Sequence, residues 1–200
     1  MADRKNRPRK PVPRNPEETR AGLIDAAEAE FNAHGFHGTD TNRIARRAGY
    51  APQTFYRHFA DKTAVFIAVY DRWWKDEIAA LGPALERKST EQSAQRAARI
   101  VMGFHVRWRG FRRALRHLAL EDPNVRAARI AARMAQMARL RAMSGNGRPQ
   151  RSDAELVGAL LTIERLCDAA AEGELADLGL SARAATALVA RAMSDLIGLA

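Results

Sequence analysis

Apolar residues recur every three to four positions along most of the chain, and no segment sustains the alternation of apolar and polar residues that is typical of a strand. The clearest case follows Asp61, where eight apolar side chains share one face of a helix. They are Val65, Phe66, Val69, Tyr70, Trp73, Trp74, Ile78 and Leu81. The pattern predicts an all-α protein of nine or so helices.

Start and stop signals separate three short helices near the N-terminal end. Asn15 followed by Pro16 predicts the start of the first helix, and Gly35 predicts its end. A second helix is expected in "TDTNRIARRAG" and a third, begun by Pro52, in "YAPQTFYRHF". Two short helices joined around Gly49 predict a helix-turn-helix. Longer helices are then expected over about 61–81, 90–109, 110–120, 123–143, 153–171 and 181–199, with a break at Gly82-Pro83.

The chain is basic, with 33 Lys and Arg against 23 Asp and Glu and a net charge of +10. This balance favours a polyanionic partner, such as nucleic acid or an anionic membrane surface. Residues 1–14 hold six basic residues, one acidic residue and three prolines, which predicts a disordered arm that adds salt-dependent affinity for such a partner. Residues 96–141 hold twelve arginines, which we interpret as the solvated faces of helices.

Several classes of protein are disfavoured. Cys167 is the single cysteine, so the chain can form neither an internal disulfide nor a thiolate cluster. His117 and Glu121 are four residues apart, but no third ligand lies near them in sequence, so no metal site is predicted. No arrangement of catalytic residues is recognisable, and we expect neither an enzyme nor a cofactor. The absence of a long apolar run and of a secretory signal predicts a cytoplasmic protein that does not enter a membrane.

The segment "GFHGTDTNRIARRAGYAPQTFYRHFADKTAVF" resembles the DNA-binding domain of TetR-type transcriptional regulators, and the match covers about residues 17–70. The shared features are the Gly35-Phe36 turn, Thr39, Ile44-Ala45, Ala48-Gly49, Tyr56, His58-Phe59 and Lys62. The resemblance implies a homodimer built on the last two long helices, double-stranded DNA as a partner, and a small-molecule effector. It divides the chain into the arm 1–14, a DNA-binding domain over 15–62, and an effector-binding and dimerisation domain over 63–200.

The resemblance also implies which residues face DNA. Phe55 and Phe59 are four apart and should anchor the third helix to the core, while its other side faces DNA. The expected DNA contacts are Thr41, Asn42, Pro52, Gln53, Thr54, Tyr56, Arg57, His58 and Lys62. Within this set, Gln53 and Thr54 are assigned to base readout. Tyr56, His58 and Lys62 are assigned to phosphates.

Seven residues of the second domain are candidates either to line an effector pocket or to fill a core. They are Phe104, Trp108, Phe111, Met134, Met137, Ile163 and Cys167. The first alternative predicts a ligand-responsive regulator, expected to be a repressor that an effector releases from a pseudo-palindromic operator. The second predicts an effector-free DNA-binding or architectural protein whose C-terminal domain only dimerises. A hollow second domain would favour the first alternative.

Overall fold

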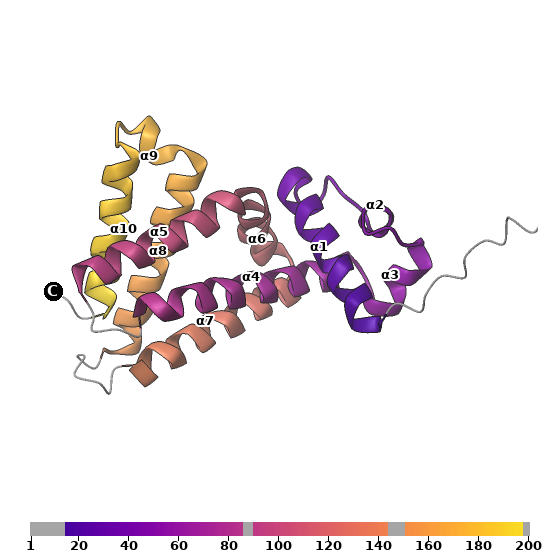
Figure 1. The fold of residues 1–200 in the computed structure, drawn as a ribbon, viewed down its shortest axis with the longest axis horizontal. Coiled ribbons are helices and arrows are strands. Elements are labelled where there is room, and N and C mark those ends of the chain that lie inside the picture. Colours follow the sequence, from indigo (N-terminus) through magenta and orange to yellow (C-terminus); the bar gives the residue numbers. More distant parts are fainter. Residues whose placement is uncertain (1–14, 86–89, 144–150, 198–200) are drawn as a thin grey trace, which may run out of the picture.

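The computed structural model describes residues 15–85, 90–143 and 151–197, and within these ranges it is all-α, as predicted. The helices are α1 (Pro16–His34), α2 (Thr41–Arg47), α3 (Pro52–His58), α4 (Lys62–Leu85), α5 (Glu91–Arg107), α6 (Arg109–Glu121), α7 (Pro123–Met143), α8 (Asp153–Glu172), α9 (Glu174–Asp177) and α10 (Ala182–Ile197). Figure 1 shows α1–α3 gathered at one end of an elongated molecule; we call them the head, and α4–α10 the body.

Capping side chains set where the head's helices begin. The Asn15 side chain accepts a hydrogen bond from the Glu17 amide at 3.1 Å, and the Asp40 side chain accepts one from the Arg43 amide at 2.8 Å. Ala51 offers α3 no such bond, so this seven-residue helix depends on its packing. The head's core lies between the three helices and the first turns of α4, and its fully buried members include Leu23, Phe31, Ile44, Phe55 and Phe66.

The helix α4 joins the head to the body and runs alongside α7 (Figure 1). Gly82-Pro83 was expected to break this helix, and that expectation is wrong, because α4 continues to Leu85 with Pro83 inside it. A proline interior to a helix removes one backbone hydrogen bond and kinks the chain. Here the proline lies in the last turn, where few later bonds remain to be disturbed.

The centre of the body is formed by α5, which packs against α4, α8 and α10. The core at this crossing is built from small side chains on α5, including Ala94, Ala97 and Ala98, set against Cys167 and Val189. Small residues let helix backbones approach closely, which accounts for the tight packing around α5. Within the described residues, no helix combines the length and the apolar character needed to cross a membrane.

The Asn32 side chain connects the head to the turn between α5 and α6. The Asn32 amide oxygen accepts hydrogen bonds from the backbone amides of Gly110, at 3.0 Å, and Phe111, at 3.2 Å. Its amide nitrogen donates to the Arg107 carbonyl oxygen at 2.7 Å. A Cβ at position 110 would lie 1.9 Å from the Asn32 carbonyl oxygen, so α1 and α6 touch at backbone distance. Glycine is therefore required there.

Candidate nucleic-acid interface and effector cavity

The helix α3 divides into a buried and an exposed side, as the four-residue spacing predicted. Phe55 is fully buried and Phe59 is 5% exposed, and their ring centroids lie 5.6 Å apart. Gln53, Tyr56 and Arg57 are exposed on the other side. Pro52, Thr54 and His58 are half-buried. The exposed side is available to a partner, and its contacts with DNA stay a prediction.

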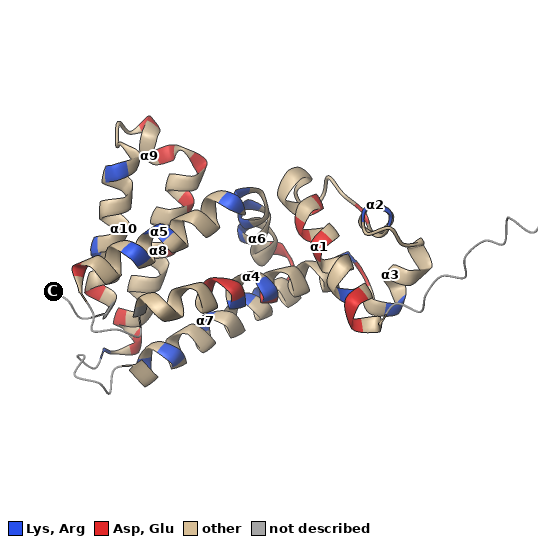
Figure 2. Ribbon diagram, viewed as in Figure 1, with Lys and Arg blue, Asp and Glu red and all other residues tan. Residues whose placement is uncertain are grey.

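A contact between two hydroxyl groups joins the start of α2 to α3. The hydroxyl groups of Thr41 and Tyr56 lie 3.0 Å apart, within hydrogen-bond distance, and Asn42 is exposed next to them. Two of the expected DNA contacts, from different helices, are thus brought together. Figure 2 shows basic residues on both helices, which include Arg43, Arg46, Arg47 and Arg57.

Lys62 has a different position from the one expected of a phosphate ligand. Its ammonium group donates to the carbonyl oxygens of Phe36, at 2.8 Å, and Thr39, at 2.9 Å, and lies 4.3 Å from the centre of the Phe36 ring. Burial lowers the pKa of this ammonium. Two of its three protons are therefore used to fasten the turn between α1 and α2, a role that the sequence did not reveal.

Glu30 is a buried carboxylate that holds α2 against α1. It accepts a hydrogen bond from the Thr39 hydroxyl at 3.0 Å, and the guanidinium groups of Arg43 and Arg47 each approach it to 3.1 Å. Burial alone would raise the pKa of Glu30, but the bonds from Thr39 and Arg47 and the charge of Arg43 lower it. The helix-turn-helix is thus fixed by an ion cluster as well as by its apolar core.

The body contains a cavity of about 100 Å³ between α4, α5, α6, α7, α8 and α10. Apolar side chains such as Leu81, Ile163 and Met193 form part of its wall. The polar part of the wall comprises Glu77, His105, Arg112, Arg133, Gln136, Arg139 and Glu164. A cavity with this lining can hold a small molecule that has both an apolar and a hydrogen-bonding part.

Of the seven residues that the sequence offered as pocket or core, Ile163 lines this cavity. Trp108 and Phe111 are buried where α5 and α6 meet the head, and Phe104 packs against the same cluster. Met137 and Cys167 are also buried, whereas the Met134 side chain is 54% exposed. The sequence marked apolar positions correctly in most cases, but it could not say which of them border empty space.

A buried guanidinium group, that of Arg112, lies beside the cavity. It donates to both carboxylate oxygens of Asp168, at 3.2 and 3.1 Å, and to Glu164 at 2.5 Å, and it stacks 4.7 Å from the centre of the Trp73 ring. Burial alone would raise the pKa of Glu164, but Arg112, Arg133 and Arg129 lower it to about 2. The interpretation of the α5–α7 arginines as a solvated face is therefore wrong for Arg112, which is 3% exposed.

Two polar atoms in the cavity wall lack a hydrogen-bond partner among the described residues. They are Nε1 of Trp73 and Oε1 of Glu77. Burial raises the pKa of Glu77 to about 7, although the charge of Arg112 opposes the shift. His105 lies beside Glu77, and burial lowers its pKa, so that its neutral ring can donate from Nδ1 to Asp168 at 2.7 Å. Buried groups without a hydrogen-bond partner are rare, and both residues that carry these groups line the cavity.

Comparison with known proteins gives matches for both parts of the molecule. The family model described as "Bacterial regulatory proteins, tetR family" matches residues 23–69. The HTH-type transcriptional activator FasR of Mycolicibacterium smegmatis is 31% identical over 82 residues, which cover 41% of this chain and 37% of that protein. The HTH-type transcriptional repressor SCO4008 of Streptomyces coelicolor is 37% identical over 59 residues, 30% of this chain and 31% of that protein. The chain thus spans about a third of the length of these relatives.

Solved structures match nearly the whole chain. A putative TetR-family transcriptional regulator from Rhodococcus sp. superimposes with a TM-score of 0.72 at 18% identity, covering 90% of this chain and 99% of that one. The fatty acid degradation regulator FadR from Bacillus halodurans superimposes with a TM-score of 0.64 at 18% identity, covering 94% and 96%. At this identity the likeness establishes a shared fold.

Proposed function

We propose that this chain, whose N-terminal domain belongs to the TetR family and whose all-α fold is that of the family's solved structures, is a ligand-responsive transcriptional regulator. It acts as a homodimer on a pseudo-palindromic operator, and a small molecule releases it. The curated relatives are named as transcriptional regulators rather than enzymes, and the printed name of SCO4008 supports the choice of repressor.

The cavity carries this proposal, because the effector-free alternative requires a filled core. Two residues that line the cavity, Trp73 and Glu77, have an indole N–H and one carboxyl oxygen, Oε1, without a hydrogen-bond partner among the described residues. A dimerisation domain gains nothing from such groups, since each costs free energy when it is buried without a hydrogen bond. The effector that fits has an acceptor for Trp73 and a small apolar part for Leu81 and Ile163.

Binding to DNA is tested most directly at Gln53, which is exposed in the first turn of α3. Its amide can bond to both edge atoms of adenine. We expect Gln53→Ala to relax the preference at one base pair per half-site by about 1–3 kcal/mol, with little change in non-specific affinity. Selection of binding sites from a random DNA pool, with wild type and variant in parallel, measures both quantities.

Tyr56→Phe is the matched control for Gln53→Ala. It removes the hydroxyl group that lies 3.0 Å from the Thr41 hydroxyl and is assigned to phosphate contact. The change should therefore weaken binding to all DNA sequences alike. Two half-sites one helical turn apart, about 34–36 Å, or a multiple of it, are expected in the selected DNA. If Gln53→Ala lowered the affinity for every DNA sequence equally, Gln53 would not take part in base readout. Failure of the wild type to enrich any sequence would overturn the proposed function.

Dimerisation is proposed to use an apolar stripe on the outer side of α8 and α10. Leu156 and Ile163 of α8 are buried inside the body and are not part of this stripe. The outward residues are Val157, Leu161 and Leu188, which are 36, 52 and 39% exposed. Pairing this stripe with its copy would form a four-helix bundle.

The basic arm over 1–14 lies outside the described residues, and its contribution to DNA affinity stays a prediction.

Leu161→Glu is expected to convert the dimer to a monomer at micromolar concentration, because it would place two carboxylates in an apolar contact. Sedimentation velocity measures the change. Leu178→Glu is the control, since Leu178 is 70% exposed but follows α9 and lies outside the stripe. A monomeric wild type, or a Leu161→Glu protein that still dimerises, would contradict the proposed interface.

A further inference from the structure

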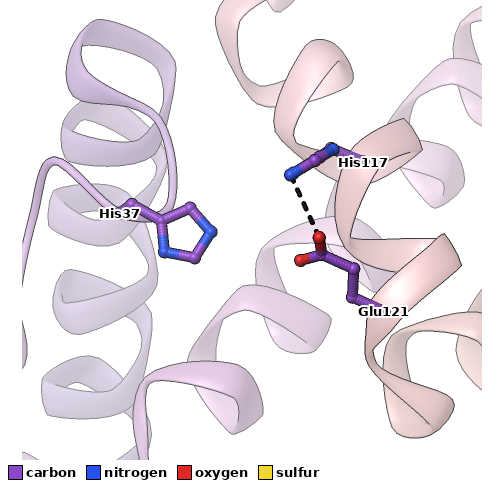
Figure 3. Close-up of side chains that lie close together, drawn as sticks. All are labelled: His37, His117 and Glu121. Atoms are coloured by element: carbon purple, nitrogen blue, oxygen red, sulfur yellow. Dashed lines mark ion pairs between the residues drawn. The ribbon is translucent and has the colours of Figure 1, made fainter.

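Three metal-ligating side chains from distant parts of the chain meet at the surface between the head and the body (Figure 3). His117 and Glu121 lie one turn apart on α6, with Nε2 and Oε1 3.4 Å from each other. His37 projects towards them from the turn between α1 and α2. One ligand atom from each of the three residues lies within 4.8 Å of the other two, and all three side chains are exposed.

The turn that carries His37 is held rigidly on both sides of that residue. Lys62 donates to the carbonyl oxygens of Phe36 and Thr39, which bracket His37 and Gly38. A Cβ on Gly38 would lie 2.2 Å from the His34 carbonyl oxygen, so the turn packs directly on the end of α1. The backbone of His37 is therefore fixed, while its exposed ring can still rotate.

The α6 side of the cluster is fixed to the head at the start of α6 and to α4 just after its end. Asn32 binds the amides at the start of α6, and the Thr63 hydroxyl donates to the Asp122 carboxylate just after its end, at 3.3 Å. The distance between the turn and α6 is thus set by contacts at both ends of that helix. The backbone positions of the turn and of α6 are therefore set by contacts other than those among the three ligands.

Neighbouring charges leave the Glu121 carboxylate available. The arginines one and two turns before it on α6 point to acids of α8: Arg116 lies 2.6 Å from Asp168, and Arg113 lies 3.6 Å from Glu172. Glu121 itself pairs with His117. A cation would bind between the carboxylate and the two imidazole rings without having to displace a guanidinium group from that pair.

We propose that His37, His117 and Glu121 bind a zinc ion that joins the head to the body. Two imidazoles and one carboxylate form a common zinc ligand set, with the fourth position left for water. Ligand atoms about 2.1 Å from tetrahedral zinc lie about 3.4 Å from one another. Because the present ligand atoms lie within 4.8 Å of one another, the cluster needs to contract by at most about 1.4 Å. Rotation of exposed side chains provides this contraction, and the bound ion holds the turn after α1 against α6.

Zinc titration by calorimetry tests the site on the full chain, freed of any affinity tag and pretreated with chelator. We expect one zinc ion per chain. His37→Ala, His117→Ala and Glu121→Gln should each lower the affinity at least about ten-fold, because changes outside the ligand shell alone cost 10–100-fold. His34→Ala is the control, since His34 is an exposed histidine at the end of α1 and is not one of the three ligands. Circular dichroism confirms that each variant is folded.

The outcome at His37 decides whether the ion bridges the two parts. A loss of zinc affinity in each of the two single variants, His37→Ala and His117→Ala, supports an ion that bridges the head and the body. Unchanged affinity in His37→Ala would mean that the ion sits on the α6 pair alone, and it would overturn the proposal. The proposal would also be overturned if the wild type did not bind zinc stoichiometrically. It would be overturned as well if His34→Ala lost as much zinc affinity as the three ligand variants. None of these measurements uses DNA, so they are independent of the proposed function.

Discussion

Replacing Arg112 with methionine is expected to lower the free energy of unfolding by about 3–5 kcal/mol, which is the usual cost of removing one partner from a buried ion pair. The variant keeps the volume of the side chain but leaves Asp168 and Glu164 without the guanidinium group that bonds to both. Asp168 is 3% exposed and cannot recover this interaction from water. Urea unfolding at pH 7, followed by circular dichroism, measures the loss.

The control for this change is Arg165→Met on the surface of the same region. Arg165 pairs with Glu174, and both side chains are largely exposed, so the loss should stay within about 1 kcal/mol. Equal losses for the two variants would show that Arg112 acts as a surface charge. An intermediate loss would mean that Arg116, which also reaches Asp168, compensates for the missing guanidinium group.

The cost of Arg112→Met should depend on pH in a defined direction. The pKa of Glu164 in the folded state is about 2, below its ordinary value of 4.5, and that of Asp168 is lowered further from its own value. Such groups stabilise the fold fully above the ordinary value and lose the contribution as pH falls through the folded value. The difference between wild type and Arg112→Met should therefore be full at pH 7 and shrink between pH 4.5 and about 2.

Phe59→Ala is expected to cost about 3–5 kcal/mol of stability, as large-to-small changes of buried phenylalanines do. Phe59 follows α3 directly, packs against Phe55, and carries the Arg20 guanidinium group 5.0 Å from its ring centre. Because α3 has seven residues and no side-chain cap, this packing is what keeps it folded. We expect the variant to lose affinity for every DNA sequence, in contrast to Gln53→Ala.

Thermal and urea unfolding give the stability change, and the random-pool selection gives the DNA affinity. Tyr56→Ala is the comparison, since Tyr56 is an aromatic residue of the same helix that is 57% exposed. Tyr56→Ala should lower the free energy of unfolding by less than about 1 kcal/mol, as substitutions at surface positions usually do. If Phe59→Ala proved no more destabilising than Tyr56→Ala, burial of Phe59 would not be what anchors α3.

The helices could be predicted from the sequence because each buries one apolar face, and that face leaves a period of three to four residues. The helix α9 escaped prediction because its four residues, Glu174–Asp177, are too few to show a period. Arg112 was misassigned for a related reason. A periodic pattern places charges on the solvent side, and it cannot show that Asp168 and Glu164 from α8 meet this arginine inside.

The same limit applies to the candidate sites. His117 and Glu121 are recognisable as a pair on one helix, but their third ligand is 80 positions away from His117, at His37, and only folding brings it near. The cavity left only a weak signal in the sequence, because a void depends on how helices pack in space rather than on which positions are apolar. That signal was Glu77. It stands four residues after Trp73 and four before Leu81, on the face of α4 that is otherwise apolar.

Because the pKa of Glu77 is raised to about 7, this residue of the cavity wall changes its protonation state near neutral pH. On the acid side of neutrality the carboxyl group is protonated and can offer a hydrogen to a carbonyl or ether oxygen. On the alkaline side the same group is an anion that only accepts, and it attracts an amine instead. A single binding site would therefore rank the same mixture of metabolites differently as the acidity around it changes.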